Sequence, residues 1–381
     1  MSNQRRARKA KQARRHERRA KIRNDESSAD WTLRDALRRA LAGHPLSLLI
    51  MASTVINVAK PEQLLSLKSD RRDTGDLDRV LTGLIGVKDR QTAGLLAVIA
   101  ELLVDDPAQQ SQCRHEVAER GEHLPRWISA LPEVDVYRAV RRTNVFGDAD
   151  ELVIGMRIDG RHELTIAVRI DHNLWSSVVD AGALPYPIGE TLARLAETSK
   201  DTSIFEMALA DARAWIEDAL NKPALAPKTG TWPVYRALVQ WLVGRLPEGG
   251  ERRLPVWDWE SNDELCDEFF ATSSAAPFTE SGHRELLLEL FDAGTGDPLR
   301  WSSARAEQAL GSAAYNDAEI PLEVALDAPD LLRAFIPYAH AQSGIRDELT
   351  SRTLAMVDAV RSSYKRDVLK RAKYWDLDDA I

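Results

Sequence analysis

The sequence predicts an α+β protein that is predominantly α-helical, with one small antiparallel sheet at about residues 135–180 and a disordered, basic N-terminal tail. Apolar side chains recur at helical spacing through most of the chain, but they alternate with a period of two inside that central segment. The 381 residues are 44% apolar, which is enough to bury a sizeable core. We therefore divide the chain into a tail at 1–29, a helical section at 30–134, the sheet at 135–187 and a second helical section at 188–381.

The tail is strongly cationic. Residues 1–23 contain eleven Lys or Arg against one acid, Glu17, so the formal charge of −8 for the whole chain combines +10 here with −18 on the remaining 358 residues. Because the segment has almost no large apolar side chain, it cannot offset the entropy of ordering, and we expect it to be disordered when free. Its cations suit phosphate groups; they are Arg5, Arg6, Arg8, Lys9, Lys11, Arg14, Arg15, Arg18, Arg19, Lys21 and Arg23.

The section after the tail is predicted to be all-helical. A helix begins near Asp30 and ends at Gly43, and Pro45 begins a second, apolar helix that runs towards Ala59. Further helices are predicted at 77–86, 90–105, 108–120 and 125–130, with a polar loop at 66–80. The helix at 90–105 is apolar almost all round, so we expect it in a core.

The sheet is predicted from two alternating runs that flank Asp159-Gly160, a dipeptide that strongly favours a hairpin. A preceding strand, Asp135 to Thr143, is expected to pair with them through a turn at Gly147-Asp148, giving three strands or more. One face of the sheet is apolar and must be covered by helices. The opposite, solvated face is expected to carry three arginines, which are Arg141, Arg157 and Arg169.

The last section is predicted to be helical again. Helices are expected at 188–198, 204–221, 280–292, 303–313, 330–342 and 346–373, with a linker at 222–230. Thr231 with Pro233 starts another helix, and Ser261 with Glu264 forms a capping-box pattern before a further one. Gly344 is expected to end the penultimate helix in the left-handed conformation.

Cysteine usage and hydropathy exclude several classes of protein. Cys113 and Cys266 lie far apart and outside any CxxC or His-linked spacing, so we expect no disulfide framework, no structural zinc and no cofactor. A reducing cytoplasm fits this composition. The longest apolar run, 46–58, contains polar residues and is too short to cross a hydrocarbon layer of roughly 30 Å, so no membrane span is expected.

A second basic cluster lies near the C-terminus, with a net charge of +5 in thirteen residues. The same helix carries an apolar stripe, and basic residues near a helix C-terminus complement its macrodipole, so we favour a solvated helix end. If this cluster faced the same way as the tail, the two would form one phosphate-binding surface. The residues we assign to that surface are Lys365, Arg366 and Lys370.

One candidate for catalysis follows the second alternating run, at Asp171-His172-Asn173. An Asp beside a His is used in general-base catalysis and around metal ions, so Asp171 and His172 are candidate catalytic residues. An Asp at a strand end more often bonds the local backbone as an Asx turn, and we favour that interpretation. The sequence contains no GxSxG motif, no phosphate-binding GxxxxGK[ST] and no strand-borne GxGxxG.

These features predict, first, a non-enzymatic cytoplasmic protein associated with nucleic acid or the ribosome, which binds RNA or DNA through residues 1–23. The alternative is a protein–protein adaptor whose acidic body binds a partner, or whose tail binds an acidic protein. A hydrolase built around Asp171 and His172 is the third hypothesis.

Three segments resemble an uncharacterised group of actinobacterial cytoplasmic proteins: Glu163 to Asn173, Gly296 to Ser302 and Pro329 to Ile345. The use of 12 Lys against 39 Arg agrees with a genome of high GC content. The resemblance covers most of residues 35–364 and leaves out the basic tail. It implies no activity, cofactor or catalytic residue.

Overall fold

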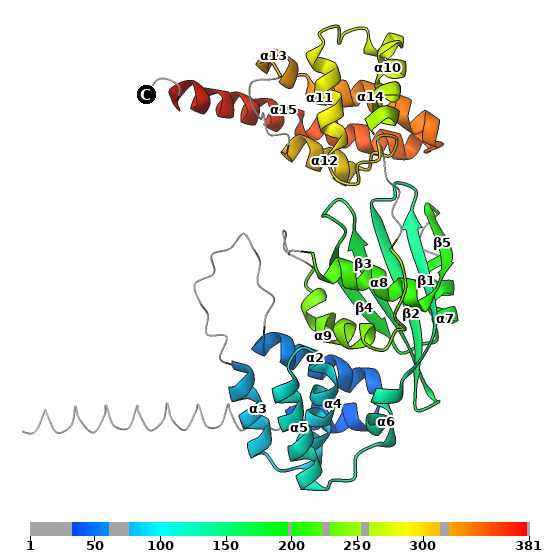
Figure 1. Ribbon diagram of the computed structural model, residues 1–381, viewed down its shortest axis with the longest axis vertical. Helices are drawn as coiled ribbons and strands as arrows, with labels where there is room; N and C mark the ends of the chain where they lie inside the picture. Colours follow the sequence, from blue (N-terminus) through cyan, green and yellow to red (C-terminus); the bar gives the residue numbers. More distant parts are fainter. Residues whose placement is uncertain are drawn as a thin grey trace, which may run out of the picture.

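The protein is described from a computed structural model, in residues 33–60, 76–196, 200–222, 229–252, 259–312 and 320–378. It is an α+β protein, predominantly helical, with one antiparallel sheet, which confirms the predicted fold class (Figure 1). The tail at 1–29, whose disorder we predicted, lies outside the described residues, as do most of the loop at 66–80 and of the linker at 222–230.

The first helices follow the predicted boundaries because capping residues fix them. They are a helix over 33–42, α2 (Pro45–Ala59), α3 (Asp76–Gly86), α4 (Arg90–Leu102), α5 (Pro107–Arg120) and α6 (Arg126–Ser129), with a short 3₁₀ turn η1 (Leu131–Glu133). The side chains of Asp89 and Asp106 accept N–H hydrogen bonds at the starts of α4 and α5. Pro45 and Pro107 occupy first turns, where a missing N–H costs nothing.

Within the described ranges, five strands form one sheet in the order β4-β3-β2-β1-β5, and every neighbouring pair is antiparallel. They are β1 (Asp135–Asn144), β2 (Ala149–Ile158), β3 (His162–Asp171), β4 (Ser177–Leu184) and β5 (Thr202–Met207). The predicted hairpin at Asp159-Gly160 is confirmed: the turn between β2 and β3 has φ of 52° and 66° at these residues.

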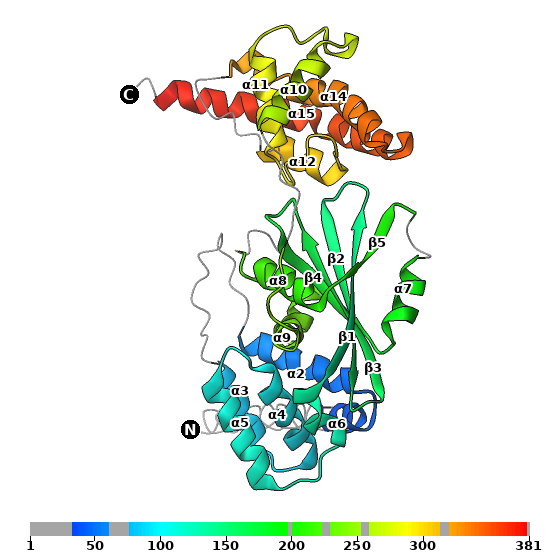
Figure 2. The same cartoon turned by 45° about the vertical axis from the view of Figure 1, so that its right-hand side comes forward.

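Helices cover both faces of the sheet (Figure 2). On one face lies α7 (Ile188–Ala196), whose Ile188 packs with Val140 and Val153. A Cβ on Gly155 would lie 2.8 Å from the Ile188 Cβ, so glycine permits this close approach. On the other face lie α8 (Leu209–Leu220) and α9 (Trp232–Val243), with the N-terminal helices beyond them.

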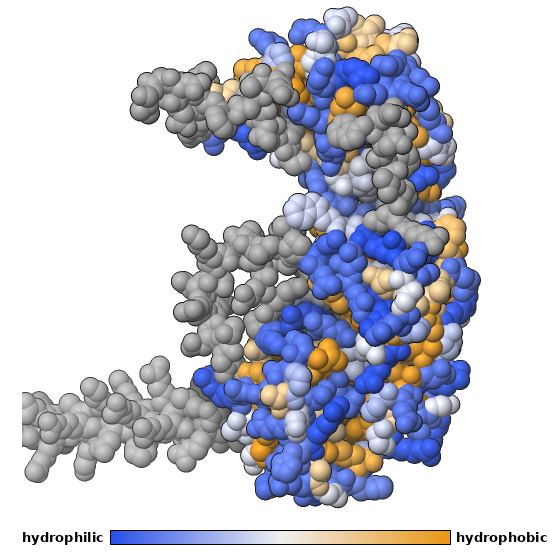
Figure 3. Space-filling view, viewed as in Figure 1, coloured by the Kyte–Doolittle hydropathy of each residue, from blue (hydrophilic) through white to orange (hydrophobic). Residues whose placement is uncertain are grey.

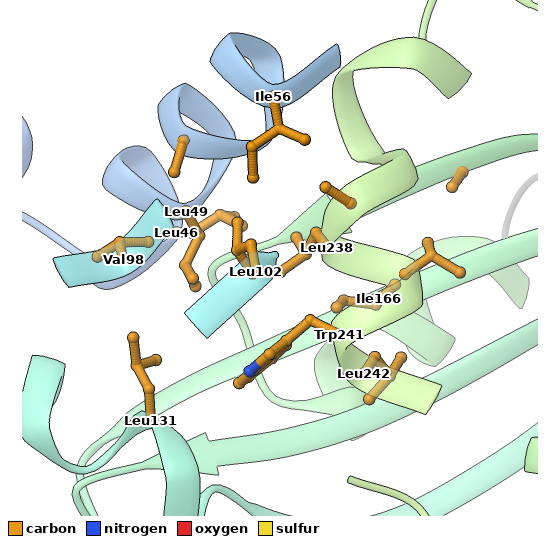
Figure 4. Packing of buried hydrophobic residues seen from close by; sticks show 14 of the residues in the cluster. Leu46, Leu49, Ile56, Val98, Leu102, Leu131, Ile166, Leu238, Trp241 and Leu242 are labelled. Atoms are coloured by element: carbon orange, nitrogen blue, oxygen red, sulfur yellow. The ribbon is translucent and has the colours of Figure 1, made fainter. Parts of the chain in front are cut away.

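The hydrophobic core of this first part joins the N-terminal helices to the sheet. Leu46, Leu49 and Ile56 of α2, with Val98 and Leu102 of α4, meet α9 over Ile166 of β3, as Figure 4 shows. The same core also includes α8 and α9. The division of the sequence assigns these two helices to the second helical section, residues 188–381.

The C-terminal helices enclose a separate core that shares no residue with the first. They are α10 (Trp259–Phe270), the 3₁₀ turn η2 (Ser273–Ala275), α11 (Gly282–Phe291), α12 (Ser303–Ser312), α13 (Leu322–Ala325), α14 (Ala328–Ser343) and α15 (Asp347–Asp378). Gly344 ends α14 with φ of 68°, as predicted. Across the described ranges, no helix combines the length and the apolarity that crossing a membrane requires.

Three local predictions were wrong. Residues 204–207 belong to β5 and not to a helix, and Ser261 lies inside α10 and not at its start. Arg141 lies on the α8 face of the sheet and not on the face of Arg157 and Arg169: a bulge between Val136 and Arg138 shifts the alternation of β1 relative to β2. Arg141 therefore lies beside Trp215 of α8.

Candidate functional site: a cleft between the sheet and the C-terminal helices

A cleft of about 690 Å³ lies where the turns at one end of the sheet meet the C-terminal helices. In Figures 1 and 2 the strand ends point towards the C-terminal helices across this junction. The space-filling view shows mainly hydrophilic residues around it (Figure 3). The turn at 144–147, the turn at 172–176, the start of β5 and the segments 294–300 and 343–345 all contribute to the lining.

Direct contacts hold the two sides of the cleft together. The Gln308 side chain of α12 donates a 2.8 Å hydrogen bond to the Asn173 carbonyl oxygen. Gly294 packs so closely on this turn that a Cβ would lie 2.4 Å from the Asn173 Oδ1 atom. Arg346 forms a 2.5 Å ion pair with Asp201 near the start of β5. The cleft thus has two walls that these contacts link.

The C-terminal wall is organised by Arg305, a fully buried side chain of α12. Its guanidinium donates hydrogen bonds to the carbonyl oxygens of Phe291, Ala293 and Arg300, at 2.8, 2.8 and 3.0 Å, and also to that of Asp297. Burial lowers the pKa of Arg305 to about 10, so it stays charged at neutral pH. Arg305 therefore fixes the shape of the loop at 293–300 and is not free to bind a ligand.

Three polar side chains in the sheet-side wall form what we call the Ser–His–Asp relay: Ser176, His172 and Asp150. The Ser176 Oγ atom lies 2.9 Å from the His172 Nδ1 atom, and the His172 Nε2 atom lies 3.1 Å from the Asp150 Oδ2 atom. All three residues are buried, yet all three line the cleft. Because a carboxylate only accepts hydrogen bonds, Nε2 carries the proton and Nδ1 accepts one from the Ser176 hydroxyl group.

The turn that presents Ser176 has an unusual backbone. Trp175 and Ser176 both have φ of 57°, in the left-handed region that non-glycine side chains rarely adopt. Two such residues in succession cost free energy that the surrounding structure must offset. The turn ends β3 and starts β4, so Ser176 lies at the lip of the sheet, facing the cleft.

Basic and aromatic side chains surround the relay. The Arg141 guanidinium lies over the rings of Phe205 and Trp215, at 5.4 and 5.3 Å, and 3.7 Å from the Asp150 carboxylate. Two aromatic side chains of the lining are exposed, Trp175 at 62% and Phe205 at 48%. The charged side chains of the lining are Arg141, Lys222, Arg252 and Arg300, against Asp150 and Asp297. The lining therefore has an excess of positive charge.

Arg252 has unused donors. Its Nη1 atom pairs with Asp218, but its buried Nε and Nη2 atoms have no hydrogen-bond partner among the residues that the structure describes. Burial lowers the pKa of Arg252. A buried guanidinium with unused N–H groups beside a cleft is suited to an anionic ligand, since leaving such donors unpaired costs free energy.

The two catalytic candidates of the sequence lie in different surroundings. The Asp171 side chain accepts a 2.9 Å hydrogen bond from the Asn173 N–H, which is an Asx turn, and its burial raises the pKa of the Asp171 carboxyl. His172 pairs with Asp150 instead of its neighbour. Sequence reasoning missed Asp150 and Ser176. Asp150 shares the apolar face of β2 with Leu152. An acid among apolar positions of a strand could have identified it as a candidate site residue.

The predicted basic surface is described only in part. Residues 1–23 lie outside the described residues. In α15, Lys365 pairs with Asp330 at 3.0 Å, while Arg366 and Lys370 are exposed. Lys365 follows the start of α15 by 18 residues, or about 27 Å of helix, so this cluster is remote from the cleft.

Comparisons of the chain with protein-family models, with curated proteins and with solved structures found no match. The resemblance to actinobacterial proteins stays a prediction. Within the described residues, no three His, Cys, Asp or Glu side chains are grouped so that they could hold a metal ion. The geometry of the cleft and the charge of the tail are therefore the features that bear on function.

Proposed function

We propose that this chain is a cytoplasmic nucleic-acid-binding protein that holds single-stranded segments in the cleft, with residues 1–23 as a second contact. The observation that carries the proposal is the convergence of Arg141, Arg252 and Arg300 with two exposed aromatic side chains, Trp175 and Phe205, on one cleft. Proteins that bind single strands combine cations that track the phosphates with aromatic rings on which bases stack.

The aromatic side chains distinguish this cleft from a simple anion site. Trp175 and Phe205 are more exposed than large apolar side chains usually are in a folded protein, and they come from different elements of the sheet. A base stacked on such a ring contributes about 1–3 kcal/mol to binding, whatever its identity. The cleft therefore favours a single strand, whose bases are free to stack, over a duplex.

The tail supplies a second, less specific contribution. Eleven bases in 23 residues can neutralise several phosphates and release their counterions. A ribosome-associated role is consistent with this chemistry, because ribosomal RNA offers both single-stranded segments and a high density of phosphate. Binding through the tail alone would show little sequence preference.

The proposal is tested by fluorescence anisotropy with a labelled 12-nucleotide RNA and its DNA counterpart. We expect the full chain to bind both, and to lose about a thousandfold or more in affinity between about 50 and 200 mM salt. Deletion of residues 1–23 should remove most of the salt dependence. Replacement of Lys365, Arg366 and Lys370 by Gln should remove a smaller part, because Lys365 already pairs with Asp330.

The cleft is tested separately with Phe205→Ala and Arg300→Gln. Each should weaken binding of the truncated chain about tenfold, because a stacking or phosphate contact is lost. The matched control is Arg169→Gln, which removes an exposed arginine from the α7 face of β3 and should change nothing. A full chain that binds neither RNA nor DNA at low salt, yet captures an acidic protein through residues 1–23, would replace this proposal by the adaptor.

A further inference from the structure

The Ser–His–Asp relay has the components of a nucleophilic site, and the nucleic-acid proposal does not use them. Ser176, His172 and Asp150 form a continuous line of two hydrogen bonds, at 2.9 and 3.1 Å, along the wall of the cleft. We propose that Ser176 is a nucleophile, activated by His172, and that the cleft hydrolyses carboxylic esters whose acyl group carries a negative charge.

The direction of the hydrogen bonds supports a nucleophilic role for Ser176. Asp150 accepts from the Nε2–H group of His172, so the Nδ1 atom has a free electron pair directed at the Ser176 hydroxyl group. A base within hydrogen-bond reach of a hydroxyl, itself oriented by a third group, is the arrangement that activates serine. His172 acts here through Nδ1, and Asp150 is a positioning residue because it acts through His172.

The backbone supports the same assignment independently. Trp175 and Ser176 are both left-handed, at φ of 57°, in the sharp turn between β3 and β4. Strain of this kind clusters at functional sites. In hydrolases with a nucleophile on a strained turn, the sharp bend lifts the serine into the binding space. Here it brings a buried serine to the surface of the cleft.

The charge of the cleft indicates the class of substrate. The buried Nε and Nη2 atoms of Arg252 have no partner in the described part of the chain, and Arg141 and Arg300 line the same cleft. N–H donors of this kind bind a carboxylate or phosphate on the acyl group and stabilise the negative oxygen that develops during acyl transfer. Arg141, Arg252 and Arg300 already pair with Asp150, Asp218 and Asp297, but a neutral ester would leave the Nε and Nη2 donors of Arg252 without a partner in the described part of the chain.

The reaction balances with water as the second reactant. The Ser176 Oγ atom forms a bond to the ester carbonyl carbon while its proton moves to the His172 Nδ1 atom and the carbonyl electron pair moves to oxygen. The tetrahedral intermediate collapses, the bond to the leaving alcohol breaks, and the alcohol oxygen takes the proton from His172. Water then attacks the acyl group on Ser176 by the same route, which releases the carboxylic acid and restores the serine.

The first test is covalent labelling of the full chain with a fluorophosphonate, followed by intact mass measurement and peptide mapping. We expect one adduct, located on Ser176. Ser176→Ala should abolish it, and His172→Ala should slow it about a hundredfold or more. Two matched controls should label like the parent chain: Ser177→Ala, which removes the adjacent buried serine, and His283→Ala, which breaks the contact of a buried histidine with the half-exposed Asp327 outside the cleft.

The role of Asp150 needs a readout other than rate. Asp150→Asn should slow labelling and also change the ¹⁵N spectrum of the His172 ring, because an amide can donate and so no longer fixes the proton on Nε2. Slower labelling with an unchanged ring spectrum would overturn the positioning role. Absence of labelling in the folded parent chain, or an adduct at another serine, would overturn the nucleophile itself.

The second test concerns the substrate. Above the uncatalysed rate, hydrolysis of the p-nitrophenyl monoester of succinic acid should be about tenfold or more faster than that of p-nitrophenyl acetate. Arg252→Gln should remove this preference, whereas Arg169→Gln on the α7 face of the sheet should leave it unchanged. Equal rates for the two esters would overturn the anionic substrate class. These measurements contain no nucleic acid, so their failure and the failure of the binding proposal are distinguishable.

Discussion

At the scale of single residues, Trp175 carries a conformational cost that its packing does not offset. The side chain is 62% exposed and its φ is 57°, where an ordinary residue loses about 1–2 kcal/mol relative to the right-handed conformation. Asparagine tolerates this region. We therefore expect Trp175→Asn to raise the free energy of unfolding by about 1 kcal/mol in urea, while it weakens the binding of single strands because the stacking surface is lost.

The control for this prediction is Trp175→Phe, which keeps an aromatic ring and the same backbone cost. It should leave stability within about 0.5 kcal/mol of the parent chain and retain most of the affinity for single strands. A loss of stability in Trp175→Asn would mean that the indole packs more tightly than its exposure indicates, and that these contacts outweigh the backbone cost.

His340 makes the stability of the C-terminal helices depend on pH. Its ring is buried against the Trp301 backbone and the Thr350 hydroxyl group, and burial lowers its pKa to about 4. In the unfolded chain the same ring takes a proton below about 6.5. Because the unfolded state binds more protons between these values, stability falls as the pH falls from about 6.5 to 4, by about 3 kcal/mol in total.

The measurement is urea unfolding at several pH values, compared with His340→Gln, which cannot titrate. The difference in stability between the two chains should shrink steadily from neutral pH towards pH 4. His115→Gln, at an exposed position on α5, is the control for removing a histidine outside the C-terminal helices. A difference that stays constant with pH would show that His340 is not the responsible group.

The sequence could predict those parts of the site that depend on residues close together in the chain. His172 was identifiable because it follows a strand beside an acid, and the Asx turn at Asp171 is a local structure. Asp150 was detectable only as an acid in phase with the apolar face of β2. Its pairing with His172 depends on the register of β2 and β3, which sequence periodicity leaves open. No sequence pattern indicated Ser176 as a site residue, because the turn imposes its backbone conformation.

At the scale of elements, most local signals predicted local structure correctly, although the capping-box pattern at Ser261 did not mark the start of α10. The starts of α4 and α5 and the Asp159-Gly160 turn were predicted because neighbouring residues determine them. β5 was predicted as part of a helix because its six residues lack a clear alternation. It is a strand because its backbone pairs with β1, 58 to 68 residues earlier in the chain. Pairing at that distance overrides local preference.

Gly160 tests the importance of the β2–β3 turn. Gly160 has φ of 66°, and a Cβ added there would meet open space. Gly160→Ala therefore adds no clash and changes only the backbone preference. We expect it to lower the free energy of unfolding by about 1–2 kcal/mol. Gly182→Ala in β4 is the matched control, because Gly182 also has open space but an ordinary φ. Equal effects of the two changes in urea unfolding would contradict a special role for this turn.

At the scale of the whole molecule, the two hydrophobic cores are built from different residues and meet through polar contacts around the cleft. A ligand that contacts both walls, one carrying Arg252 and the other Arg300, would therefore add a link between the two bodies that these cores stabilise. Ligand binding should raise the stability of whichever body unfolds first, since binding requires both walls to be folded.

The independence of the cores predicts two thermal transitions in calorimetry of the full chain. Phe335 is fully buried in the C-terminal core, and Leu238 is fully buried in the core around the sheet. Phe335→Ala and Leu238→Ala should each cost about 3 kcal/mol or more, through lost burial and the cavity left behind. Each change should lower the midpoint temperature of one transition and leave that of the other unchanged, because the affected side chains share no neighbours. If either substitution lowered both transitions together, the contacts around the cleft would couple the bodies into one cooperative unit, and the cleft would then be a rigid site before any ligand binds.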